Sequence, residues 1–151
     1  MTGAPPAAAA RSRRSRRATV VYLDSSALVK VIVAEAETDA LLTYLRSHPV
    51  QVTSRIATVQ VARAVARQGA VDPARASAVI EQVTLIELDA EVADRAGALA
   101  PASLRSLDAI HLATAIGLRR ELDAVITYDT RLAAGADLHG LPVATPGLRR
   151  G

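Results

Sequence analysis

Residues 19–34, TVVYLDSSALVKVIVA, join a short run of apolar and β-branched residues to an apolar helical pattern through one aspartate. The run Thr19–Leu23 has the length and composition of a buried strand, and Ser25–Ala34 has the spacing of a helix that begins at once. Strands that are apolar on both faces are typical of parallel sheets covered by helices. This stretch therefore predicts an α/β fold with Asp24 at the carboxyl end of its first strand.

Short strands and helices alternate over the rest of the chain. Further strands are expected at Val50–Thr53, Thr84–Leu88, Ala124–Tyr128 and Leu141–Ala144. Helices are expected at Thr38–Ser47, at Arg55–Gln68, from Pro73, from Asp89 to about Leu99, and from Ser106 to about Arg119. The pattern predicts a three-layer α/β sandwich, with a short parallel sheet of four to five strands flanked by helices.

The composition excludes several classes of protein. The 151 residues fit one domain, and the hydrophobic share of 50% is enough for a core. The absence of cysteine excludes a disulfide scaffold, a thiolate zinc site and a cysteine nucleophile. Because no apolar run reaches the roughly 18–20 residues of a membrane span, we expect a cytoplasmic protein without a membrane partner.

The net charge of +3 hides an uneven distribution. Seven arginines lie near the two ends of the sequence: Arg11, Arg13, Arg14, Arg16, Arg17, Arg149 and Arg150. Without them, 11 basic and 15 acidic side chains remain, a net charge of −4. We expect residues 1–18 to form a disordered basic leader, 19–146 the folded domain and 147–151 a C-terminal tail.

Two aspartates follow predicted strands, Asp24 after TVVYL and Asp129 after AVITY. Ligands of open parallel sheets gather at the carboxyl ends of the strands, which makes both aspartates candidate site residues. Alternatively, each caps the next helix. For Asp24 the functional interpretation is favoured, because Ser25 and Ser26 are available as caps.

Asp108 lies in SLDAIHLATAI, a helix that is apolar on nearly every side. A carboxylate on an apolar face is costly unless a cation or hydrogen-bond donors satisfy it, although its place in the first turn also suits the helix dipole. His111 follows three residues later, and with only three histidines we expect it to be structural. Gln60 also lies on a mostly apolar face, where hydrogen-bonded burial is the plainer interpretation.

A group of carboxylates without cysteine or a histidine triad favours Mg²⁺ or Mn²⁺, which prefer oxygen ligands. Such sites support metal-assisted attack of water on a phosphodiester. The sequence lacks a glycine-rich phosphate loop and a nucleophile elbow.

Four segments, in this order and spacing, resemble the PIN domain, and most closely the VapC toxins: VYLDSSALVKVIVAE, VTSRIATVQVARAV, LRSLDAIHLATAI and VITYDTRLA. The resemblance spans about residues 20–146. It implies a PIN-like sandwich and a Mg²⁺- or Mn²⁺-dependent endoribonuclease, the toxin of a type II toxin–antitoxin system. It also implies an RNA substrate, a VapB-type antitoxin and a toxin homodimer.

The resemblance also assigns individual residues. Asp24, Asp108 and Asp129 match the first, third and fourth acids of the family, which are catalytic metal ligands, and Thr127 matches a hydroxyl position often found before the last acid. Gln60 stands where the family has glutamate. Because an amide lacks the negative charge, we expect Gln60 to weaken metal binding and Gln60→Glu to raise activity.

Three hypotheses follow. The first is a metal-dependent ribonuclease toxin, and the second is a catalytically silent PIN module that binds RNA or its antitoxin. The third is a phosphoacceptor domain in which Asp24 or Asp129 is modified with help from Lys30 and Thr127. The third is disfavoured because receiver-type domains need an acidic pair at the first strand, where this chain has Ser25 and Ser26.

Overall fold

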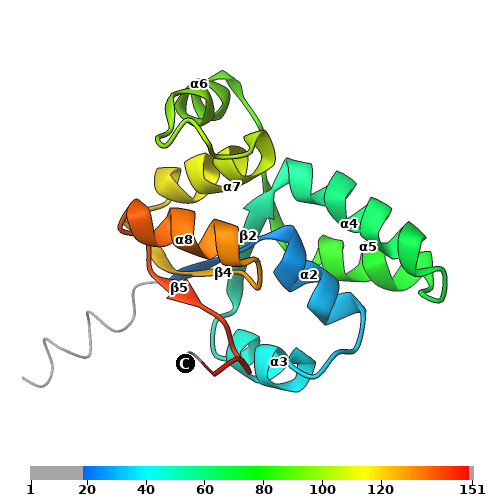
Figure 1. Ribbon diagram of the computed structural model, residues 1–151. Helices are drawn as coiled ribbons and strands as arrows, with labels where there is room; N and C mark the ends of the chain where they lie inside the picture. Colours follow the sequence, from blue (N-terminus) through cyan, green and yellow to red (C-terminus); the bar gives the residue numbers. More distant parts are fainter. Residues whose placement is uncertain (1–18, 150–151) are drawn as a thin grey trace, which may run out of the picture.

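The computed structural model describes residues 19–149 and contains a five-stranded parallel sheet (Figure 1). The predicted leader and residues 150–151 lie outside this range. The spatial order is β3-β2-β1-β4-β5, with the strands β1 (Val20–Leu23), β2 (Val50–Ser54), β3 (Thr84–Ile86), β4 (Leu122–Ile126) and β5 (Val143–Ala144).

Helices cover both faces of this sheet. One face packs against α2 (Ser25–Ile32), α3 (Thr38–Arg46), α4 (Arg55–Gln68) and α5 (Pro73–Glu81). The other packs against α7 (Ser106–Gly117) and α8 (Thr130–Leu138), and α6 (Ala90–Ala98) lies against α7. The predicted three-layer α/β sandwich is confirmed.

The buried strand β1 supplies both layers of the core because its side chains alternate between the faces. Val21 and Leu23 pack with α2, α3 and α4, whereas Tyr22 packs with α7 and α8. All three side chains are at most 1% exposed, as expected for a central strand with helices on both sides.

The order of the strands defines a point at which the direction of winding reverses. From β1 the chain builds outward through β2 and β3, then returns to place β4 on the other side of β1. Leu23 pairs with Ile126 in the β1–β4 ladder. The residues that follow these two strands therefore meet at the carboxyl edge, the usual place for a ligand site in such sheets.

Local signals in the sequence predict most element ends. Ser54 caps α4, Gly69 ends it with a positive φ of 68°, and Pro73 opens α5 behind the cap Asp72. The strand predicted at Ala124–Tyr128 is Leu122–Ile126 in the structure, so Asp129 lies three residues beyond its end. None of the helices within residues 19–149 combines the length and apolar character that crossing a membrane requires.

Candidate active site at the carboxyl edge of the sheet

Asp24 lies between the carboxyl ends of β1 and β4 and is 3% exposed. Its Oδ1 accepts hydrogen bonds from the backbone N–H of Ala27 at 2.9 Å and from the Ser26 hydroxyl at 2.6 Å. The Thr127 hydroxyl donates to Oδ2 at 2.5 Å. Asp24 therefore caps α2 itself. The expectation that Ser25 or Ser26 takes over the cap is wrong, because Ser26 donates to the aspartate instead.

The burial of Asp24 changes its acidity. Desolvation raises the pKa of its carboxyl to about 6, and the charge of Asp129 adds to this rise. The three hydrogen-bond donors oppose the shift but do not cancel it. A carboxylate offers about four lone-pair positions, so after three hydrogen bonds one position remains for another ligand.

Asp129 and Asp108 are more accessible to solvent than Asp24. Asp129 caps α8, where its Oδ1 accepts from the N–H of Arg131 at 2.9 Å. Asp108 is half-buried in the first turn of α7. Burial and the charge of Asp129 raise its pKa, while Arg105 and Arg131 lower it. Lys30, the helper in the phosphoacceptor hypothesis, pairs instead with Glu35 at 2.7 Å and Glu37 at 2.9 Å.

Gln60 is oriented by a buried chain of hydrogen bonds that starts at Tyr22. The Tyr22 hydroxyl donates to Nδ1 of His111 at 2.6 Å, and Nε2–H of His111 donates to Oε1 of Gln60 at 2.7 Å. This direction follows because Oε1 only accepts. Burial lowers the pKa of His111 to about 4, so its ring is neutral at pH 7, and both ring nitrogens are occupied. The expectation that His111 is structural is confirmed.

The interaction partners of Gln60 were not predictable from the sequence. Tyr22 and His111 are 89 residues apart, and His111 and Gln60 are 51 residues apart. Since the amide oxygen is turned toward His111, the amide nitrogen is the group left to interact with a ligand.

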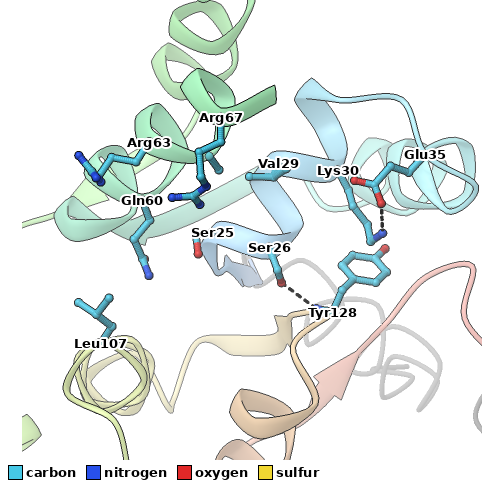
Figure 2. A pocket seen from close by; sticks show the side chains of 11 residues that line it. Ser25, Ser26, Val29, Lys30, Glu35, Gln60, Arg63, Arg67, Leu107 and Tyr128 are labelled. Carbon is cyan, nitrogen blue, oxygen red and sulfur yellow. Dashed lines mark hydrogen bonds and ion pairs between the residues drawn. The ribbon is translucent and has the colours of Figure 1, made fainter. Parts of the chain in front are cut away.

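Two cavities meet at Gln60. One, of about 530 Å³, is lined by Gln60, Leu107, Asp108 and Asp129 together with Arg105 and Arg131. The other, of about 580 Å³, lies between α2 and α4 and includes Gln60, Arg63, Arg67 and Leu107 in its wall. Figure 2 shows Gln60 on α4 and Leu107 on α7 facing each other across the opening of this second cavity.

The carboxylates fit a divalent cation in their chemistry. Asp24 keeps one lone-pair position, and no described residue hydrogen-bonds to Oδ2 of Asp129 or to the Asp108 carboxyl. Within residues 19–149, however, no three acidic or histidine side chains are close enough to form a ready metal cluster. Direct ligation by all three acids stays a prediction, and Mg²⁺ usually keeps several water ligands in any case.

The sequence also matches a known family. The profile of the PIN domain matches residues 21–138, which is most of the described chain. The chain therefore belongs to the PIN-domain family. This confirms the resemblance found in the four sequence segments.

Curated relatives refine the assignment within the family. The chain is 42% identical over 126 residues to Ribonuclease VapC46 of Mycobacterium tuberculosis, covering 83% of this chain and 97% of the relative. It is 40% identical over 136 residues to Ribonuclease VapC47 of the same species, covering 87% and 100%. These relatives are of the VapC type that the sequence resembles.

Solved structures show the same fold. A toxin–antitoxin complex from Klebsiella pneumoniae contains a chain with a TM-score of 0.64 and 26% identity, covering 83% of this chain and 97% of that one. The VapC20 toxin of Mycobacterium tuberculosis matches with a TM-score of 0.59 and 15% identity over 76% of this chain and 93% of its own. At that identity the second match concerns the fold alone.

The buried Asp24 and His111 are expected to affect stability in opposite directions over nearly the same pH range. From pH 4 to 6, folded Asp24 keeps a proton that the unfolded chain has lost, so it lowers the free energy of unfolding as pH rises. Over the same range the unfolded chain still holds the His111 proton that the folded chain lacks, so His111 raises that free energy. We expect Asp24→Asn to remove the first effect.

The free energy of unfolding of metal-free Asp24→Asn should therefore rise with pH relative to the native chain, by about 2 kcal/mol between pH 4 and pH 7. Urea unfolding at several pH values measures the difference. Asp94→Asn, at an exposed position of α6, is the control and should follow the native profile. Parallel profiles for Asp24→Asn and the native chain would mean that Asp24 ionises normally.

Gln60→Glu tests whether residue 60 faces the metal. A glutamate can keep the hydrogen bond from His111 with one oxygen and present the other, now charged, to a cation. We expect a lower melting temperature without metal because of repulsion by the aspartates, and a larger rise with Mn²⁺ than in the native chain. RNA cleavage should also be faster.

Differential scanning calorimetry with and without Mn²⁺ measures the stability change. The control is Gln68→Glu at the exposed end of the same helix, which should show neither the metal-dependent rise nor faster cleavage. An Mn²⁺ response of Gln60→Glu equal to that of the native chain would exclude contact between residue 60 and the metal.

Proposed function

We propose that this protein is a cytoplasmic, Mg²⁺- or Mn²⁺-dependent endoribonuclease and the toxin of a toxin–antitoxin pair. The observation that carries the proposal is the buried Asp24 between the ends of β1 and β4, with Asp108 and Asp129 together in one cavity. Burial is the main cause of the raised pKa of Asp24 and of Asp108, and the charge of Asp129 contributes to both shifts, which supports a shared site. The relatives named ribonucleases support the activity.

The chain's own residues have distinct roles in this proposal. Asp24, fixed by Ser26 and Thr127, offers a single oriented lone pair, while Asp108 and Asp129 approach from α7 and α8. When bound, a divalent ion would activate water for attack on the phosphodiester and stabilise the leaving oxygen. The neutral His111 holds Gln60 so that its amide nitrogen is directed away from the His111 ring.

The competing function is a silent PIN module that binds RNA or an antitoxin without cutting. Gln60 is the observation in its favour, because it replaces a charged ligand with a neutral amide. The phosphoacceptor hypothesis loses support because Lys30, its proposed helper, is held by two glutamates.

Cleavage of total RNA by the purified protein, with Mn²⁺ or with a chelator, separates the two functions. We expect metal-dependent cutting, and a loss of at least 100-fold in Asp24→Asn and in Asp108→Asn, because each removes a charged oxygen ligand. Asp94→Asn should cut at the native rate, since its side chain is exposed on α6. Native rates in both site variants would refute the proposed site, and no cutting by any form would favour the silent module.

We also propose a VapB-type antitoxin and a toxin homodimer as the protein partners. Outside the two arginine-rich ends the chain carries a net charge of −4, which favours a basic partner segment. A solved neighbour described as a toxin–antitoxin complex supports this partner.

Expression of the native chain should arrest growth, and co-expression of the gene beside it should restore growth. The control is Asp108→Asn, whose expression should be tolerated without the neighbour because the proposed activity is lost. Arrest by both forms alike would separate the toxicity from the site. Mass determination in solution tests the homodimer.

A further inference from the structure

We propose that Arg63 and Arg67 form a phosphate-binding track, which holds the RNA backbone on the α4 side of the aspartates. This inference rests on the proposed ribonuclease function and names the residues that position the substrate. Both arginines line the cavity of about 580 Å³ that shares Gln60 and Leu107 with the cavity of the acids. A strand bound at the acids can therefore continue directly into the arginine-lined cavity.

The spacing on α4 places the track on one face of the helix. Gln60, Arg63 and Arg67 are three and four residues apart, the separations that bring side chains onto the same side of a helix. Figure 2 shows the three side chains projecting from α4 at the border of this cavity. With its carbonyl bonded to His111, Gln60 adds its amide N–H groups to the donors of the two guanidinium groups.

The charge balance of the cavity favours an anion. Of its charged side chains, Lys30 is bonded to the lining residue Glu35 and to Glu37, so these three side chains carry one net negative charge. The side chains of Arg63 and Arg67 are exposed, and their guanidinium groups have no hydrogen bond or ion pair to another residue within 19–149. Together these five side chains carry one net positive charge, and both guanidinium groups are available to a phosphate.

The absence of an obvious stacking surface makes backbone contacts more important for this chain. Tyr22 is buried, and Tyr44 stacks on His48 with ring centroids 4.1 Å apart. Tyr128 lines the arginine-lined cavity, but the Lys30 ammonium already lies 4.8 Å from its ring centroid. Single-stranded RNA is held by a combination of base stacking and backbone charge neutralisation. With the tyrosines already engaged, the arginines are the groups suited to hold the strand through its phosphates.

The test measures RNA affinity and its salt dependence rather than cleavage alone. The full chain carries Asp108→Asn, so that RNA stays uncut, and binds a fluorescein-labelled single-stranded RNA of 12 nucleotides, followed by anisotropy at several salt concentrations. Adding Arg63→Gln and Arg67→Gln should weaken binding about tenfold or more at low salt. The slope of log K against log salt should become shallower by about 1.4, since each lost contact to single-stranded nucleic acid accounts for about 0.7.

The matched control replaces two arginines outside both cavities, Arg75→Gln and Arg120→Gln, with the same change in net charge. Both are exposed, and Arg120 lies just before β4 begins, at the amino-terminal end of the strands. The control should keep the slope of the parent. Circular dichroism melting checks that all forms fold.

An unchanged slope in the Arg63/Arg67 variant, or an equal loss in the control, overturns the track. Unchanged RNA binding with lost antitoxin binding overturns it too, and assigns these arginines to the protein partner. If the native chain cuts RNA while the arginine variant binds RNA like its parent, the phosphate-binding track is refuted and the ribonuclease function stands. If the native chain neither binds nor cuts RNA, the proposed function fails with it.

Discussion

The burial of one carboxylate constrains the whole carboxyl edge of the sheet. Asp24 is 3% exposed, and a charge in such a place is tolerated only when hydrogen-bond donors replace the lost water. The donors come from two sources: the first turn of α2 and, through Thr127, the end of β4. The same Thr127 hydroxyl accepts a hydrogen bond from the N–H of Asp129 at 3.0 Å. The hydrogen bonding that the buried Asp24 needs therefore also fixes the backbone at Asp129.

Features that depend on neighbouring residues, such as strands and helix caps, were predictable from the sequence. Hydrogen bonds between residues far apart in the sequence were not. The strands, the caps at Ser54, Asp72 and Asp89, and the class of fold follow from signals a few residues long. The hydrogen bonds from Tyr22 through His111 to Gln60 join three elements, and no local pattern encodes which polar groups meet in a core. For the same reason the phosphoacceptor hypothesis gave Lys30 a role beside an aspartate, whereas Lys30 is bonded to glutamates five and seven residues farther along the chain.

Gln60 and Leu107 lie between a cavity lined by Asp108 and Asp129 together with two arginines and a cavity lined by Arg63 and Arg67. The acids attract metal ions and repel phosphate, and the arginines do the reverse. The Gln60 amide is neutral and therefore adds no charge to either cavity. A glutamate at this position would add a negative charge on the side of Arg63.

The hydrogen bond between Thr127 and Asp24 joins residues that are 103 positions apart in the chain. During synthesis the first strand leaves the ribosome long before its neighbour β4 exists, and at about 5–20 residues per second the interval is on the order of ten seconds. Until then the edge where the acids meet is incomplete. The complete edge can therefore form only after β4 and Thr127 have been synthesised.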